Sequence, residues 1–173
     1  SHHLGALVAP LSIRSEGRLS HPLLFAGGAF PAGIPLKSTY RFNSYRLIYR
    51  YDFFRRERLE MGAGLTAKIR DAAIRVEGGG IESEKTNVGF VPLIHFRFLW
   101  KFGRNLSFLL DGDALAAPQR RAEDVFAGLT THLTDRMDLK LGYRIVEGGA
   151  DNDEVYNFAL IHFFSAGMIF RIH

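Results

Sequence analysis

The stretch Glu57-Arg58-Leu59-Glu60-Met61-Gly62-Ala63-Gly64-Leu65-Thr66-Ala67-Lys68-Ile69-Arg70 alternates almost without interruption. Its odd-numbered positions from Leu59 onward are apolar, and its even-numbered positions are charged, polar or glycine. A period of two predicts a β-strand with one apolar and one polar side. Strands of soluble proteins usually run about 5–6 residues, whereas a tilted membrane strand needs about 9–11. The stretch therefore predicts a membrane strand whose polar side lines a narrow lumen.

The composition agrees with strands rather than helices as the membrane-crossing element. Hydrophobic residues make up 47% of the 173 residues, yet no run approaches the ~18 apolar residues of a transmembrane helix. Fifteen Phe and six Tyr are typical of the aromatic girdles of membrane barrels. The absence of cysteine excludes disulfides and thiolate metal sites.

The basic charge does not indicate a nucleic-acid partner. The net charge is +4, but the cationic residues alternate with apolar ones instead of forming one basic run. The start of the chain shows no signal peptide, which a mature secreted protein would have lost. Ser1-His2-His3 resembles the remnant of a purification tag, and no role is assigned to it.

Eight segments carry the strand pattern. On the first, Leu7, Ala9, Leu11 and Ile13 are predicted to face lipid. On the third, a bulge near Asp71–Ala72 is predicted to turn Ala72, Ile74 and Val76 to the lipid side. The segments are Leu4–Arg14, Ser38–Phe53, Glu57–Val76, Asn87–Phe102, Leu106–Ala117, Glu123–Leu133, Met137–Val146 and Val155–Ile172.

The connections alternate in length. Tight turns are predicted after the second, fourth and sixth segments, at Phe54-Arg55-Arg56, Gly103-Arg104-Asn105 and Thr134-Asp135-Arg136. Longer loops are predicted at Ser15–Lys37, Glu77–Thr86 and Glu147–Glu154, and Pro118–Ala122 is short. Short turns at one end and long loops at the other are typical of outer-membrane barrels.

The last strand ends Phe170-Arg171-Ile172-His173, which resembles the C-terminal aromatic signal of outer-membrane proteins. Together, the segments and connections resemble small eight-stranded barrels of the OmpA and OmpX class. The resemblance implies an all-β, eight-stranded, antiparallel up-and-down transmembrane β-barrel that forms one domain over residues 1–173. It also implies a porin-like monomer in the outer membrane of a Gram-negative bacterium. Its partners would be the lipid bilayer and lipopolysaccharide, with no nucleic acid and no cofactor.

The polar sides of the strands predict a network of charges in the lumen. Counting back from the tight turns pairs Asp52 with Arg58, Arg50 with Glu60, Arg97 with Asp111, His95 with Asp113 and His132 with Asp138. Opposite charges across strands each contribute about 0.2–1 kcal/mol. The predicted network comprises Arg46, Arg50, Asp52, Arg58, Glu60, His95, Arg97, Asp111, Asp113, Asp124, His132, Asp138, Lys140 and Arg144, with Lys68, Arg70, Lys101 and Arg171 as further lumen cations.

Four features invite a more specific interpretation. His95 with Asp111 and Asp113 is either an acid–base or metal cluster or, as we expect, part of the lumen network, because metal sites want three or four convergent ligands. His162 either faces lipid at mid-height or is turned inward by a bulge at Phe163-Phe164. The acidic segment Glu147–Glu154 is either a cation site or a solvated turn. The apolar segment Leu23–Gly33, with Phe25 and Phe30, is expected over the barrel mouth or at the outer interface.

The leading hypothesis is a non-enzymatic outer-membrane barrel with a structural or surface-interaction role, or a narrow gated pore. The alternatives are a lipid A-modifying deacylase or acyltransferase and a soluble lipocalin-like carrier. A PagL-type deacylase carries His and Ser two residues apart on one face, whereas Ser165 lies three residues from His162. No catalytic residue and no metal ligand is therefore expected.

Overall fold

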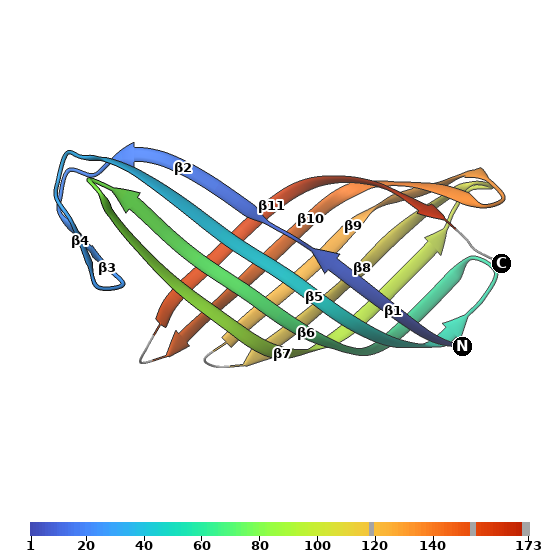
Figure 1. Ribbon diagram of the computed structural model, residues 1–173. Helices are drawn as coiled ribbons and strands as arrows, with labels where there is room; N and C mark the ends of the chain where they lie inside the picture. The colour runs from blue at the N-terminus through green and yellow to red at the C-terminus, as the bar shows by residue number, and fades with distance from the viewer. Residues whose placement is uncertain (118–119, 153–154, 171–173) are drawn as a thin grey trace. The chain divides into compact units, whose positions relative to one another are not determined.

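The structure is a computed structural model that describes residues 1–117, 120–152 and 155–170 (Figure 1). It is all-β and antiparallel, as predicted. The strands are β1 (His2–Ala9), β2 (Ser12–Arg18), β3 (Leu23–Phe25), β4 (Gly28–Phe30), β5 (Pro35–Arg55), β6 (Leu59–Gly78), β7 (Ile81–Lys101), β8 (Leu106–Ala117), β9 (Arg120–Thr134), β10 (Met137–Asn152) and β11 (Val155–Phe170).

One sheet has an up-and-down order. The order is β1-β5-β6-β7-β8-β9-β10-β11, and β2 also pairs with β5. The predicted first strand is thus interrupted at Pro10 and Leu11, where proline cannot donate to the ladder. Counting β1 and β2 as one position gives the eight predicted strands. Among the described residues there is no helix long and apolar enough to cross a membrane.

The chain divides into two compact units. Unit 1 holds Ser1–Gly5, Ile48–Thr66 and Pro92–His173, and unit 2 holds Ala6–Leu47 and Ala67–Val91. In unit 1, β8 to β11 lie side by side in unbroken antiparallel pairing, apart from one irregularity at Met137 and Asp138 (Figure 1).

The strands β5 to β10 separate their side chains between two faces. The buried face carries Asp52, His95, Asp113, Asp124 and Asp138, which are all below 9% exposed. The exposed face carries large apolar residues, among them Leu65, Phe90, Ile94, Leu141 and Phe164. A single sheet can separate residues so cleanly because successive side chains point to opposite sides.

The side chains of β1 point to the opposite faces from those predicted. His2 contacts the Tyr49 and Tyr51 rings on the exposed face, whereas His3 contacts Asp52 on the buried face. Leu7, Ala9 and Leu11 therefore share the buried face with His3, and their predicted lipid orientation is wrong. On β1 the exposed apolar residues are Leu4 and Val8. Both faces of this segment are apolar, so the pattern did not distinguish them.

The bulge predicted near Asp71–Ala72 is not found, because β6 keeps one alternation across these residues. The even-numbered residues Thr66 and Lys68 lie on the buried face before this point, and the even-numbered Ile74 and Val76 lie on it afterwards. Val76 is only 6% exposed and belongs to a small core with Phe30 and Leu36, against which Ile74 packs. Ile74 and Val76 therefore do not face lipid, because the segment before β5 covers them.

This covering segment is the β3–β4 hairpin, which forms its own two-stranded sheet in unit 2 (Figure 1). Its tip, Ala26-Gly27, has positive φ at both residues, as a tight hairpin turn requires. Phe30 is 1% exposed and anchors the hairpin to the sheet. The apolar Leu23–Gly33 segment thus packs on the buried face of unit 2.

Gly28 provides a test of this packing. A Cβ built on Gly28 would lie 2.1 Å from the Ser83 Oγ atom of β7, so Gly28→Ala would push the hairpin from the sheet. Overpacking of this kind costs about 1–3 kcal/mol, and we expect faster proteolytic cleavage between residues 19 and 34. Gly17→Ala is the matched control, since a Cβ there meets nothing within 4 Å. Equal cleavage rates for both variants would contradict the packing.

Several predicted connections are shorter than expected. β6 ends at Gly78 and β7 begins at Ile81, so Gly79 and Gly80, both at positive φ, form the turn where Glu77–Thr86 was predicted as a loop. β10 continues to Asn152 in register with β11, so Glu147–Asn152 is strand rather than loop, and residues 153–154 lie outside the described residues. β9 already begins at Arg120. The long loops at one end are therefore mostly strand.

Candidate functional site

The candidate site is the charged part of the buried face in unit 1. Two of the predicted cross-strand pairs lie between β7 and β8, where the register places Arg97 opposite Asp111 and His95 opposite Asp113. Arg97 Nη1 lies 2.9 Å from Asp111 Oδ2, and His95 Nδ1 lies 3.0 Å from Asp113 Oδ1. A third pair, His132 with Asp138, joins β9 to β10. These three predicted pairs are confirmed.

An ion pair with two hydrogen bonds joins β9 to β10. Arg144 donates from Nε to Asp124 Oδ1 over 2.6 Å and from Nη2 to Oδ2 over 2.8 Å. This two-bond geometry matches the planar guanidinium to the carboxylate. The Asp124 side chain is 4% exposed and that of Arg144 is 29% exposed, so the carboxylate is shielded from water and the guanidinium only in part.

The two predicted pairs beside the first turn are wrong. Arg56 and Leu59 exchange backbone hydrogen bonds, so the turn starts at Arg56, two residues beyond its predicted start at Phe54. Arg58 therefore lies in the turn, exposed, and does not face Asp52. Gly62 takes that place, since a Cβ there would lie 2.4 Å from Asp52 Oδ1.

The charged residues predicted to pair across this turn contact other residues instead. Arg50 Nε lies 2.7 Å from Asp52 Oδ1 on its own strand, and His3 Nε2 lies 2.7 Å from Asp52 Oδ2. Glu60 accepts from Lys101 Nζ of β7 over 2.6 Å instead of pairing with Arg50. The sequence analysis did not predict this contact of His3, because Ser1-His2-His3 was interpreted as the remnant of a tag.

Apolar and aromatic side chains fill the space between the ion pairs of unit 1. Leu93, Leu109 and Phe126 are each below 5% exposed on the buried face. Lys140 lies with Nζ 3.7 Å from the centroid of the Phe126 ring, a cation–π contact. The buried face thus mixes ion pairs with a small apolar layer, which the charge pattern alone did not predict.

The predicted lumen cations of unit 2 lie on its buried face. Arg46 is 7% exposed and donates from Nε to Ser44 Oγ over 3.0 Å, and Lys68 is 3% exposed beside the Phe42 ring. Arg70 donates from Nη2 to Asn87 Oδ1 over 2.5 Å. Arg171 lies outside the described residues.

The arrangement around His95 does not form a catalytic pair. Thr66 is 1% exposed and donates its hydroxyl proton to Asp113 Oδ1 over 2.5 Å, and His95 contacts the same oxygen. A nucleophile must be bonded to its base, but Thr66 is bonded to the carboxylate rather than to His95. No group of three His, Cys, Asp or Glu side chains that could hold a metal ion occurs among the residues described.

His162 lies on the exposed face, and the pairing of β10 with β11 contains no bulge at Phe163 or Phe164. It lies opposite Ile145, and its Nδ1 is 2.8 Å from the Tyr143 hydroxyl. On this face of β11 it lies between the exposed apolar residues Leu160 and Phe164. Ser165 faces the opposite side, as the alternation predicted.

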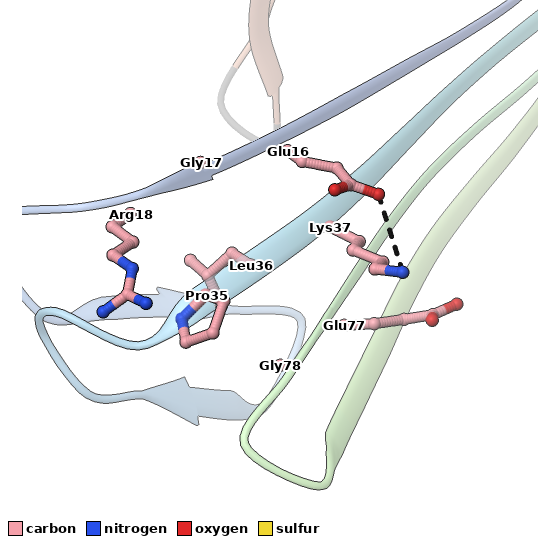
Figure 2. A pocket seen from close by; sticks show the side chains of 8 residues that line it. All are labelled: Glu16, Gly17, Arg18, Pro35, Leu36, Lys37, Glu77 and Gly78. Carbon is pink, nitrogen blue, oxygen red and sulfur yellow. Dashed lines mark ion pairs between the residues drawn. The ribbon is translucent and has the colours of Figure 1, made fainter.

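The described residues form a cleft in each unit. In unit 1, a cleft of about 370 Å³ lies at the turn ends of the strands and is lined by Glu60, Lys101, His132 and Asp138, among others. In unit 2, a wider cleft of about 610 Å³ runs between β2, β5 and the end of β6, as Figure 2 shows. Lys37 and Glu16 form an exposed ion pair across it, 3.5 Å long.

Comparisons with known proteins add no assignment. No protein-family model matches the chain, and neither a curated protein nor a solved structure matches it.

Proposed function

We propose that the chain is an integral β-barrel protein of a bacterial outer membrane with a structural or surface-interaction role. In this proposal the exposed face meets lipid, the buried face fills the lumen, and β1 closes against β11. The main support is that charged side chains are buried and large apolar side chains are exposed, the reverse of a water-soluble protein. Charged residues such as Asp113 and Lys68 are 3% exposed, whereas Leu65 and Phe164 are 66% and 94% exposed.

The extent of the apolar residues supports a membrane-crossing band. On β5 the exposed face is apolar from Tyr45 to Phe53, on β6 up to Ile69, and on β7 from Val88 to Phe102. Beyond these ends the same face becomes polar. Asp71 there accepts from Arg41 and Asn43, and Arg75 pairs with Glu77 and Glu82. An apolar band bordered by aromatic and polar residues is typical of outer-membrane barrels.

The alternatives find less support. A lipocalin-like carrier needs apolar side chains inside and polar ones outside, which is the reverse of this arrangement. A lipid A-modifying enzyme of the His–Ser type needs both residues on one face, and Ser165 and His162 lie on opposite faces. An open pore needs free space, but ion pairs and the Leu93, Leu109 and Phe126 side chains fill the buried face.

The absence of cysteine allows a direct test. Leu65→Cys and Glu84→Cys, both exposed, are introduced singly and treated in whole cells with a membrane-impermeant maleimide. We expect Glu84→Cys to react and Leu65→Cys to stay unlabelled until the protein is unfolded in urea, because lipid covers only the second site. The unheated protein should also migrate faster in SDS gels than the boiled one. Equal labelling at both sites, with the protein in the soluble fraction, would refute the proposal.

A further inference from the structure

Two arginines lie together on the exposed face of unit 2, just beyond the apolar band. The register of β2 with β5 places Ser12 opposite Arg41 and Arg14 opposite Thr39. Directly opposite residues share a face, and diagonal neighbours on it are about 7–8 Å apart or less. Arg14 and Arg41 are such diagonal neighbours, and the Ser12 and Thr39 hydroxyls complete a patch of hydrogen-bond donors.

The charges of this patch are available to a ligand. Among the described residues, Arg14 takes part in no hydrogen bond or ion pair, and it is exposed. Arg41 is 45% exposed, and its one described contact, to Asp71 Oδ1, is 3.4 Å long. A guanidinium carries five N–H donors in a planar fork that matches two oxygens of a phosphate. Most donors of the patch are therefore free.

The position of the patch along the strands indicates the source of the phosphate. Tyr45 of β5 and Val8 of β1 are the last exposed apolar residues before it, and tyrosine favours the membrane interface. Arg41 is four residues beyond Tyr45, which is roughly 13 Å along a strand. A strand tilted by about 45° rises roughly 10 Å over that length, which places the patch at the level of lipid headgroups.

We infer that Arg14 and Arg41, with the hydroxyls of Ser12 and Thr39, bind a phosphate group of a membrane lipid headgroup such as that of lipid A. This inference rests on the proposed function, because only a membrane orientation brings the patch to the headgroups. It deepens that function by naming which residues hold the lipid. The neighbouring charges do not compete, since Lys37 is paired with Glu16, and Arg75 with Glu77 and Glu82.

The test measures lipid binding by the full chain folded in detergent micelles. The protein is titrated with lipid A that carries both phosphates, and bound lipid is counted by native mass spectrometry. One cation near an anionic surface contributes about fivefold in affinity. We therefore expect Arg14→Ala and Arg41→Ala each to weaken binding about fivefold and the double variant about 25-fold. Arg14→Lys, which keeps the charge, should retain most of the affinity.

The matched control is Lys85→Ala, which removes an exposed cation from the other face of β7 and should leave binding unchanged. Dephosphorylated lipid A should bind wild-type protein as weakly as phosphorylated lipid A binds the double variant. Equal binding by the double variant and wild type would overturn the inference. So would full competition by inorganic phosphate, which would indicate a site for free anions. The faster migration of unheated double variant in SDS gels shows separately whether the barrel proposal stands.

Discussion

Replacing Leu65 by arginine should destabilise the folded protein by about 2–4 kcal/mol, the cost of a cation at the middle of the lipid-facing side of a barrel. Leu65 is 66% exposed, and its side chain lies in the middle of the apolar part of β6. In a water-soluble protein, a substitution at so exposed a site usually changes stability by no more than about 0.5 kcal/mol. The free energy of unfolding, measured by urea titration in lipid bilayers, therefore distinguishes the two environments.

A depth series provides the control for this prediction. Val88→Arg introduces the same side chain at the end of the apolar part of β7, where Val88 is 69% exposed. Near the membrane interface such a change costs only about 0–1 kcal/mol. If Leu65→Arg and Val88→Arg had equal effects, the exposed face would not have the depth dependence of a lipid contact, and the membrane orientation would be wrong.

The second large effect is expected at the buried ion pair of β9 and β10. Asp124→Ala removes the carboxylate that accepts both hydrogen bonds from Arg144, whose side chain is 29% exposed. Removing one partner of a fully buried pair costs about 3–5 kcal/mol, and water and the carboxylates of Asp111 and Asp113 near Arg144 reduce this to about 2–3 kcal/mol. We expect a loss of this size in the free energy of unfolding, measured by urea titration.

Two further variants separate the loss of the pair from the loss of side-chain volume. Combining Asp124→Leu with Arg144→Met removes both charges and fills the site with apolar atoms, which is often neutral for a buried pair. The double variant should therefore be more stable than Asp124→Ala. Lys37→Ala breaks a pair in which both side chains are about 70% exposed and should cost no more than about 1 kcal/mol. A cost below about 1 kcal/mol for Asp124→Ala would show that the pair does not stabilise the fold.

The accuracy of the sequence prediction depended on where each turn was placed. The Gly103-Arg104-Asn105 turn was correctly located, because glycine and asparagine mark turns, and it led to the correct pairs for Arg97 and His95. The first turn contains no such residue, and it lies at Arg56–Leu59 instead of Phe54–Arg56. Both charge pairs derived from it were wrong, since a displaced turn shifts every pair along the hairpin.

Other errors came from segments whose pattern allowed two interpretations. The first strand is apolar on both faces, so only its contacts with Tyr49 and Asp52 showed which side of it is buried. The Gly79-Gly80 dipeptide is a hairpin signal, yet it was absorbed into a longer loop. The position of the β3–β4 hairpin depends on Phe30 and Val76, which are far apart in the chain. Nothing local to either residue predicts that contact.

By itself, the sequence determined that this chain forms long antiparallel strands with one charged and one apolar side. That property is local, because successive side chains of a strand point to opposite faces whatever the strand pairs with. Only the tertiary structure decided which charges become partners and which apolar residues are covered. Those contacts depend on turn positions, on strand register and on the packing of the hairpin, each of which is set by residues distant in the chain.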